Sequence, residues 1–262
     1  MRFSAAGRVV LTTGLLVGLI SACTNHHQPV KVVATVASKV RPTAAPVPPD
    51  PRVGAVFLGA GSLHTCSGGV LDSAAGDLIL TAAHCVAEGA DATFVAGLKD
   101  TAAPADVWHI DAVYLDPRWV QNQDPQADFA IARVSRDAGG TIEALAGGGL
   151  KLAPAPKPGT IVTVSGYGLG VGGGPVGCRV AITPDTKGFP TLACAGMSDG
   201  LSGAPWIVGP TVIGVIGGLD GGGCNDSLSY SPPFDNAITQ LLARAEAAGP
   251  ADDAPTVFED TC

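Results

Sequence analysis

Three segments of the chain place an imidazole, a carboxylate and a hydroxyl in surroundings that suit nucleophilic catalysis. His84 lies in Thr-Ala-Ala-His-Cys, Asp128 in Ala-Asp-Phe-Ala-Ile-Ala, and Ser202 in Gly-Leu-Ser-Gly-Ala-Pro-Trp. A serine hydroxyl is a weak nucleophile until a nearby base takes its proton and a carboxylate orients that base. Glycines around the serine let main-chain N–H groups approach a reacting carbonyl, so the N–H groups of Gly200 and Ser202 are candidates for an oxyanion hole. These residue types together predict acyl transfer through a serine nucleophile.

Other residues of the same types are weaker candidates. His64 and His109 lack the flanking residues of the first motif, and Asp116 and Asp124 lie in Pro-containing turns without a following apolar strand. A hydrolase of the α/β class needs Gly-x-Ser-x-Gly at its nucleophile and the chain order Ser, Asp, His. The last position of that motif is Ala204 here, and the chain order is the reverse, so this class is disfavoured.

The order His, Asp, Ser with these flanks resembles that of the chymotrypsin-like (trypsin-fold) serine peptidases, over about residues 53 to 247. Residues 164–168, Val-Ser-Gly-Tyr-Gly, are similar to the Gly-Trp-Gly segment that opens the second barrel in that family. The resemblance implies that Ser202 is the nucleophile, His84 the general base and then acid, and Asp128 the residue that fixes the imidazole tautomer. It also implies two antiparallel six-stranded β-barrels with the active site between them, a peptide or protein substrate, and no metal or organic cofactor.

The chain departs from the family pattern in two places. Leu201 replaces the aspartate that precedes the nucleophile and that pairs with a newly cut N-terminus in the trypsin branch. No Ile-Val-Gly-Gly activation sequence precedes the domain, where Pro51-Arg52-Val53-Gly54 stands instead. We therefore expect activity without cleavage before Val53, as the combination resembles bacterial secreted and glutamyl-type members. An inactive member that binds peptides or senses the envelope, and an esterase with the same triad, are the alternatives.

Substrate preference is only weakly encoded. By alignment to the family, the pocket walls come from Gly196, Met197 and Asp199 and from Gly217, Gly218 and Leu219. No acidic residue falls at the pocket base, which argues against strict cleavage after Lys or Arg, although Asp199 and Asp220 would attract a basic side chain nearby. Leu219 narrows the pocket and favours small or apolar residues.

The sequence predicts that short strands position the candidate catalytic residues. Short β-branched runs alternate with Gly, Pro and Asp turns, which is typical of an all-β barrel or sandwich. The expected strands are 53–58, 77–81, 92–98, 107–115, 129–134, 160–165, 205–208 and 211–216. A Gly/Ala-rich stretch at 139–158 is expected to join two barrels. Helical spacing of apolar residues appears only from Phe234 to Leu242, with Asp235 or Asn236 as its cap and Gly249-Pro250 as its end.

The N-terminus has the pattern of an export signal. Arg2 and Arg8 precede an apolar run from Val9 to Ile20, which is too short to span a bilayer. Small residues before Cys23 resemble the lipobox of bacterial lipoproteins, which implies a signal peptide at 1–22 and lipidation of Cys23. An ordinary secretory signal is the alternative. We expect a Pro-rich tether at 23–51, a peptidase domain at 52–248 and a tail at 249–262, and we assign no metal to the two histidines of the tether.

The cysteine count supports export. The chain has seven Cys, an odd number, and an anchor at Cys23 leaves an even set at positions 66, 85, 178, 194, 224 and 262. The family resemblance implies a Cys66–Cys85 disulfide. Three pairings remain for the other four, of which Cys178–Cys194 with Cys224–Cys262 is favoured and Cys194–Cys224 is the main rival.

Composition excludes several classes of function. The chain has 262 residues, a formal charge of −8, a mean hydropathy of +0.33 and 46% hydrophobic residues, so it is not expected to be disordered. The acidic balance, which grows when the basic leader is removed, argues against nucleic-acid binding. We expect a monomer outside the cytoplasm that is attached to the membrane through its lipid or is secreted.

Overall fold

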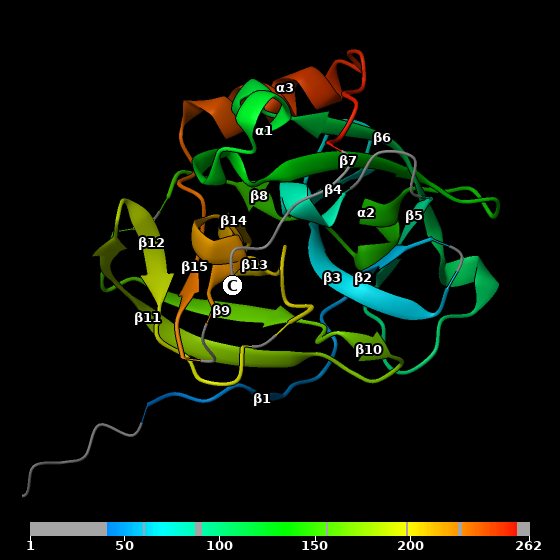
Figure 1. Ribbon diagram of the computed structural model, residues 1–262. Helices are drawn as coiled ribbons and strands as arrows, with labels where there is room; N and C mark the ends of the chain where they lie inside the picture. Colours follow the sequence, from blue (N-terminus) through cyan, green and yellow to red (C-terminus); the bar gives the residue numbers. More distant parts are fainter. Residues whose placement is uncertain are drawn as a thin grey trace, which may run out of the picture. The chain divides into compact units, whose positions relative to one another are not determined.

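Two sheets of mostly antiparallel strands build the folded part of the chain (Figure 1). The computed structural model describes residues 41–59, 61–86, 91–155, 157–197, 199–224 and 227–255. The signal peptide and Cys23 lie outside these residues. Within the predicted tether, β1 (Ala45–Pro46) pairs with a strand of the second sheet.

The first sheet closes into a six-stranded barrel. Its strands are β2 (Val53–Leu58), β3 (Leu63–Val70), β4 (Leu78–Thr81), β5 (Ala92–Ala96), β6 (Trp108–Leu115) and β7 (Ala130–Ser135). They pair in the order β3-β2-β5-β6-β7-β4, and β3 pairs with β4 to complete the ring. The short β10 (Gly170–Val171) pairs with the start of β3, at Leu63 and His64.

The second sheet has the order β15-β12-β11-β9-β13-β14-β8. Its strands are β8 (Lys151–Leu152), β9 (Ile161–Gly166), β11 (Val176–Thr186), β12 (Phe189–Leu192), β13 (Pro205–Val208), β14 (Thr211–Val215) and β15 (Ser229–Tyr230). The Gly217 N–H, just after β14, donates to the carbonyl of Tyr230 in β15. This bond brings the two ends of the strand order from β15 to β14 together and closes the second barrel. The all-β double-barrel fold is therefore confirmed.

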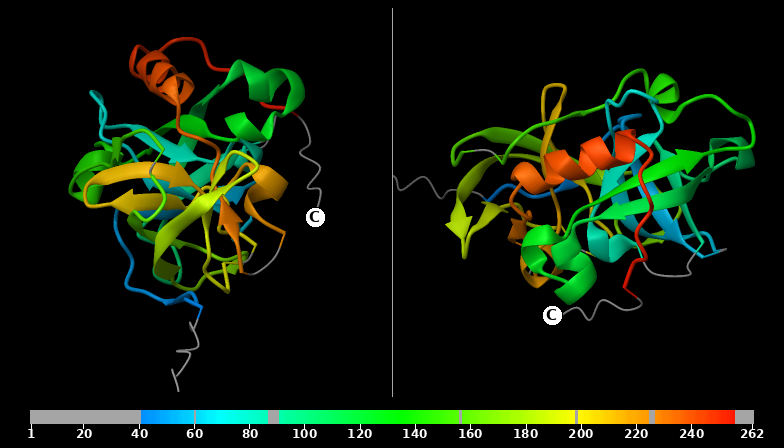
Figure 2. Two further views of the ribbon diagram at one scale, coloured as in Figure 1. Left: turned by 90° about the vertical axis from the view of Figure 1, so that its left-hand side faces the viewer. Right: turned by 90° about the horizontal axis from the view of Figure 1, so that it is seen from above.

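The helices are few and short. They are α1 (Pro117–Asn122), α2 (Ile142–Ala146) and α3 (Asn236–Glu246), with one-turn 3₁₀ segments η1 (Ala83–Cys85), η2 (Pro104–Asp106), η3 (Pro125–Ala127) and η4 (Leu219–Gly222). The C-terminal helix is confirmed, and its cap is Asp235, whose side chain accepts from the Ala237 N–H at 2.7 Å. Figure 2 shows α3 from two further sides, lying across the first barrel. None of the described helices is long and apolar enough to cross a membrane.

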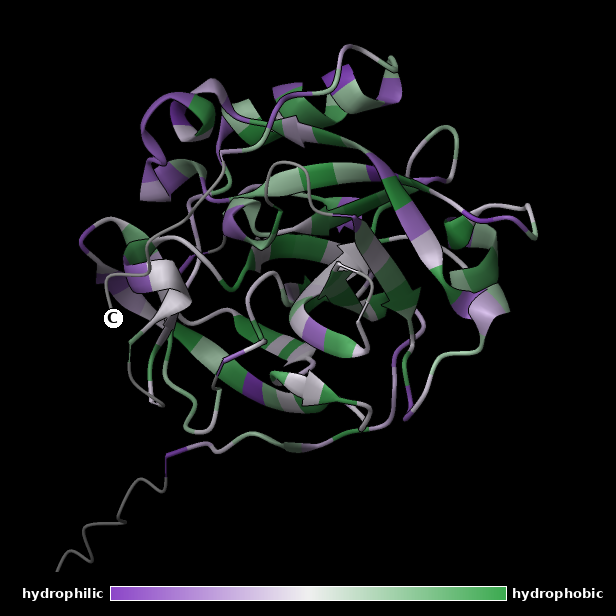
Figure 3. Ribbon diagram, turned by 45° about the vertical axis from the view of Figure 1, so that its right-hand side comes forward, coloured by the Kyte–Doolittle hydropathy of each residue, from purple (hydrophilic) through white to green (hydrophobic). Residues whose placement is uncertain are grey.

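Three of the four buried apolar clusters among the described residues hold most of the strands together. One fills the first barrel around Val56, Phe94 and Trp108, and another fills the second barrel around Val164, Leu201 and Trp206. The third joins strands of both sheets to Ile238 and other residues of α3. Figure 3 shows green apolar segments along many of the strands. The eight expected strands correspond to β2, β4, β5, β6, β7, β9, β13 and β14, whereas Gly- and Ser-containing β3 and the long β11 were not predicted.

Candidate active site

Strand pairing brings His84 and Asp128 together. His84 lies in η1 directly after β4, and Asp128 lies directly before β7. The two strands are antiparallel, with Thr81 opposite Ala130, so the residues that leave one strand lie beside those that enter the other. A disulfide between Cys66 of β3 and Cys85 ties the imidazole segment to the barrel, as the family resemblance implied.

The carboxylate of Asp128 is buried and saturated with donors. Its Oδ2 lies 2.8 Å from His84 Nδ1 and accepts from the Gly218 N–H at 2.7 Å, while its Oδ1 accepts from the His84 N–H at 3.0 Å. The Asp128 side chain is fully buried and that of His84 is 11% exposed. A carboxylate accepts only, so Nδ1 must carry a proton, and Nε2 of a neutral imidazole is then the basic nitrogen.

Ser202 is held against the same part of the first barrel through its main chain. Its carbonyl accepts from the Ser67 N–H of β3 at 2.7 Å. The next residue, Gly203, has φ of +80°, and a Cβ there would lie 2.3 Å from Thr81 Oγ1 and 2.9 Å from the Ala82 nitrogen. Only glycine permits this approach to the residues that lead into His84. The half-buried Ser202 is therefore anchored beside the segment that carries the imidazole.

The candidate oxyanion hole consists of the N–H groups of Gly200 and Ser202. Each belongs to a peptide group whose carbonyl, from the preceding residue, accepts a hydrogen bond within the fold. The Asp199 carbonyl accepts from the Leu169 N–H at 2.7 Å, and the Leu201 carbonyl accepts from the Ala204 N–H at 2.9 Å. In a trans peptide the N–H is directed opposite to the carbonyl, so the following N–H groups, those of Gly200 and Ser202, face the other side. Among the described residues neither N–H has an acceptor, as a pair waiting for a substrate oxygen would require.

Ser67 is a site residue that the sequence analysis missed. Its hydroxyl donates to the Gly200 carbonyl at 3.1 Å and accepts from the Tyr167 N–H at 2.8 Å, which fixes the loop around the candidate oxyanion hole. Burial, together with the charge of Asp50, raises the pKa of Tyr167 far above its usual range, so this phenol stays neutral. Ser67 is followed by Gly68 and Gly69, a sequence typical of a loop, so no local pattern indicates a role in the site.

The predicted pocket residues fall into two groups. Gly217 and Gly218 are buried beside the triad candidates: a Cβ on Gly217 would lie 2.9 Å from Asp128 Oδ2. Leu219 is half-buried at the start of η4. Gly196 and Asp199 are exposed, whereas Met197 belongs to the apolar interior of the second barrel.

The cysteines settle most of the pairing. Cys178 and Cys194 form a disulfide, which excludes the rival Cys194–Cys224 pairing. Cys224 is also disulfide-bonded. Cys262 lies outside the described residues, so its pairing with Cys224 stays a prediction. The thiol and imidazole atoms of Cys66, His84 and Cys85 lie close together, but the disulfide and the Nδ1–Asp128 bond already occupy them, and this group does not fit a metal.

The competing residues have structural roles. His64 is buried, with Nε2 2.9 Å from the Gly172 carbonyl, and His109 lies on β6 opposite Thr93 and Ser135. Asp116 and Asp124 accept main-chain N–H groups at the starts of α1 and η3.

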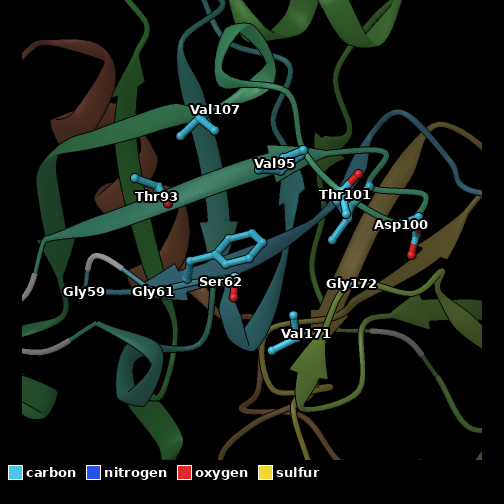
Figure 4. A pocket seen from close by; sticks show the side chains of 13 residues that line it. Gly59, Gly61, Ser62, Thr93, Val95, Asp100, Thr101, Val107, Val171 and Gly172 are labelled. Atoms are coloured by element: carbon cyan, nitrogen blue, oxygen red, sulfur yellow. The ribbon is translucent and has the colours of Figure 1, made fainter.

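A separate pocket of about 480 Å³ opens on the first barrel (Figure 4). Its lining includes Phe57, Val95, Thr101, Val107 and Val171. None of the predicted site residues line it, so it is distinct from the candidate active site.

Comparison with known proteins agrees with this geometry. A family model described as trypsin matches residues 45–238. Three similar solved structures illustrate the range: protease Anisep from Arthrobacter nicotinovorans (25% identity, TM-score 0.68, 78% of this chain and 100% of that one), the thermostable serine protease AL20 from an extremophilic microorganism (21%, 0.66, 76% and 99%) and human heparin binding protein (18%, 0.62, 80% and 99%). No curated protein matches the chain. Because the family model covers well over half of its length, the chain belongs to the trypsin family.

Proposed function

We propose that the protein is a serine endopeptidase that works outside the cytoplasm and cuts peptide bonds through Ser202, His84 and Asp128. The observation that carries the proposal is the buried Asp128 carboxylate bonded to His84 Nδ1, with the main chain of Ser202 anchored alongside. The fold alone would not suffice, since a heparin binding protein shares it.

The arrangement supports a two-stage acyl transfer. His84 Nε2 takes the proton of Ser202 Oγ as the oxygen attacks the scissile carbonyl, and the N–H groups of Gly200 and Ser202 stabilise the oxyanion that forms. The imidazolium then gives its proton to the leaving amine, which departs and leaves an acyl-enzyme. A water molecule, deprotonated by the same imidazole, hydrolyses the ester. Asp128 stabilises the imidazolium throughout without taking its proton.

The proposal extends to substrate and location. A pocket bounded by Gly196 and Leu219 would accept small or apolar side chains before the scissile bond, and a peptide-library cleavage profile tests this. Two disulfides among the described residues support export to an oxidising compartment. Lipidation of Cys23 would anchor the enzyme there, and Cys23→Ser is then expected to release it from the membrane fraction.

The decisive experiment is labelling by a fluorophosphonate probe, which reacts only with an activated serine. The unmodified protein is expected to label, and Ser202→Ala is expected not to. Asp128→Asn should label and turn over peptide about 10⁴-fold more slowly, because the imidazole loses its orienting acceptor. Ser62→Ala, in the separate pocket, is the matched control and should behave as the unmodified protein. Absence of labelling in the unmodified, folded protein would instead favour a peptide-binding member of the family.

A further inference from the structure

The segment just before the first barrel runs along the second barrel. β1 pairs with β11, with Ala45 opposite Gly177 and Pro46 opposite Val176. The Val47 N–H extends this pairing by donating to the Pro175 carbonyl at 3.0 Å. Figure 1 shows this segment, in dark blue, passing below β11. We call residues 42–47 the arm.

The arm also bonds the chain that leads to the nucleophile. The Ala44 N–H donates to the Ala195 carbonyl at 2.7 Å, and the Ala195 N–H donates to the Pro42 carbonyl at 2.8 Å. Both main-chain groups of Ala195 are therefore satisfied by the arm, with Thr43 as its parallel bridge partner. Ala44 also packs, partly buried, on the apolar interior that contains Cys194, Met197 and Leu201.

We propose that the arm is a built-in positioning strand, which holds the wall of the substrate pocket in its working shape. This proposal rests on the proposed function. The wall comprises residues 194–197 and 199–202, none of which lies in a regular strand. Within the described residues, its far end is held by Leu169, which donates to Asp199, and by Ser67, which donates to Gly200. The arm supplies the hydrogen bonds at the near end, where Gly196 follows Ala195.

Neighbouring residues indicate that the arm works uncut. Val53 is buried in β2, and its N–H donates to the Asp50 carbonyl at 2.9 Å, so a cut before it would break this turn and leave a charged amine next to a buried side chain. Leu201, buried in apolar surroundings, provides no carboxylate for such an amine. Arg52 pairs with Asp50 at 2.7 Å, within the turn that joins the arm to β2. We therefore expect the uncut arm, rather than a new N-terminus at Val53, to hold the wall of the substrate pocket.

The test uses the full-length protein with changes in the arm. Ala44→Pro deletes one N–H donor to Ala195, and deletion of residues 42–47 removes both bonds. Thr43→Ala and Ala44→Ser are the matched controls, because they keep every main-chain bond. We measure kcat and KM on a peptide substrate, fluorophosphonate labelling, thermal unfolding, and hydrogen exchange of the amides at 195–200.

Ala44→Pro and the deletion are expected to lower kcat/KM at least tenfold, mainly by raising KM, and to speed exchange at 195–200, while both controls behave as the unmodified protein. A synthetic peptide of residues 40–49 should restore part of the activity of the deletion variant. Unchanged kcat/KM and exchange in Ala44→Pro would overturn the proposal, as would equal losses in Ala44→Ser. If the unmodified protein neither labels nor cleaves, the proposed function fails, and hydrogen exchange alone still decides whether the arm orders the wall. If the deletion variant does not fold, Ala44→Pro decides.

Discussion

Leu201 offers the sharpest test of how the nucleophile loop is supported. It precedes Ser202, is 1% exposed, and its Cδ2 would lie 2.9 Å from a Cβ on Gly166. It belongs to the apolar cluster that fills the second barrel, together with Val164 and Trp206. Leu201→Asn and Leu201→Asp are almost equal in shape and differ in charge, so the pair separates lost packing from a buried charge.

The expected size follows from the burial. Loss of a fully buried leucine costs about 2–5 kcal/mol in unfolding free energy. For a unit of this length each kcal/mol shifts Tm by about 2–4 °C, so the loss of about 2–5 kcal/mol in Leu201→Asn should lower Tm by roughly 4–20 °C. Leu201→Asp should be lower still at pH 7, because an unpaired buried carboxylate is costly.

The pH dependence of stability distinguishes a buried charge from lost packing. Burial without a cation raises the folded-state pKa of the new carboxyl, so the folded state binds more protons than the unfolded state above about pH 4. The stability of Leu201→Asp relative to Leu201→Asn should therefore rise as pH falls from 7 to 4, measured by thermal unfolding. An aspartate variant as stable as the asparagine variant at pH 7 would refute this reasoning, since it would mean that a cation reaches the position.

Three further outcomes follow from single contacts. Gly217→Ala would press a methyl group against Asp128 Oδ2, so peptide hydrolysis should fall at least a hundredfold, while Gly174→Ala, 3.5 Å from its nearest neighbour, should leave it unchanged. Burial would raise the pKa of Asp116, but the hydrogen bonds and charge of Arg118 outweigh it and hold that pKa below its usual range. Asp116→Asn should therefore destabilise the protein at pH 7 by less than about 1 kcal/mol, because Arg118 is partly exposed, and this difference should vanish in thermal melts as pH falls below about 4. Replacing both Cys178 and Cys194 with serine should lower the free energy of unfolding in denaturant by about 3 kcal/mol under oxidising conditions. A variant as stable as the unmodified protein under oxidising conditions would contradict the Cys178–Cys194 disulfide.

Local patterns were enough for eight of the strands, for the C-terminal helix and for the choice of the candidate triad. Alternation of β-branched residues with turn residues marks strands such as 53–58 and 205–208, because side-chain periodicity and turn chemistry act over a few residues. His84, Asp128 and Ser202 stood out for the same reason, since each is flanked by distinctive neighbours in the sequence. Strand β3 was missed because its Cys, Ser and Gly residues pack as a strand only against both neighbours.

Main-chain contacts between distant segments were decided only by the tertiary structure. The alignment of His84 with Asp128 depends on the β4–β7 register, and the third donor to that carboxylate is the main-chain N–H of Gly218. Pro-rich sequence predicts a tether at 23–51 and gives no sign of the bonds between the arm and Ala195, because these run between peptide groups. The sequence alone was thus enough to identify the candidate site residues and most of the strands that carry them. Which peptide groups meet across the two barrels was not, because a backbone hydrogen bond leaves no side-chain signature.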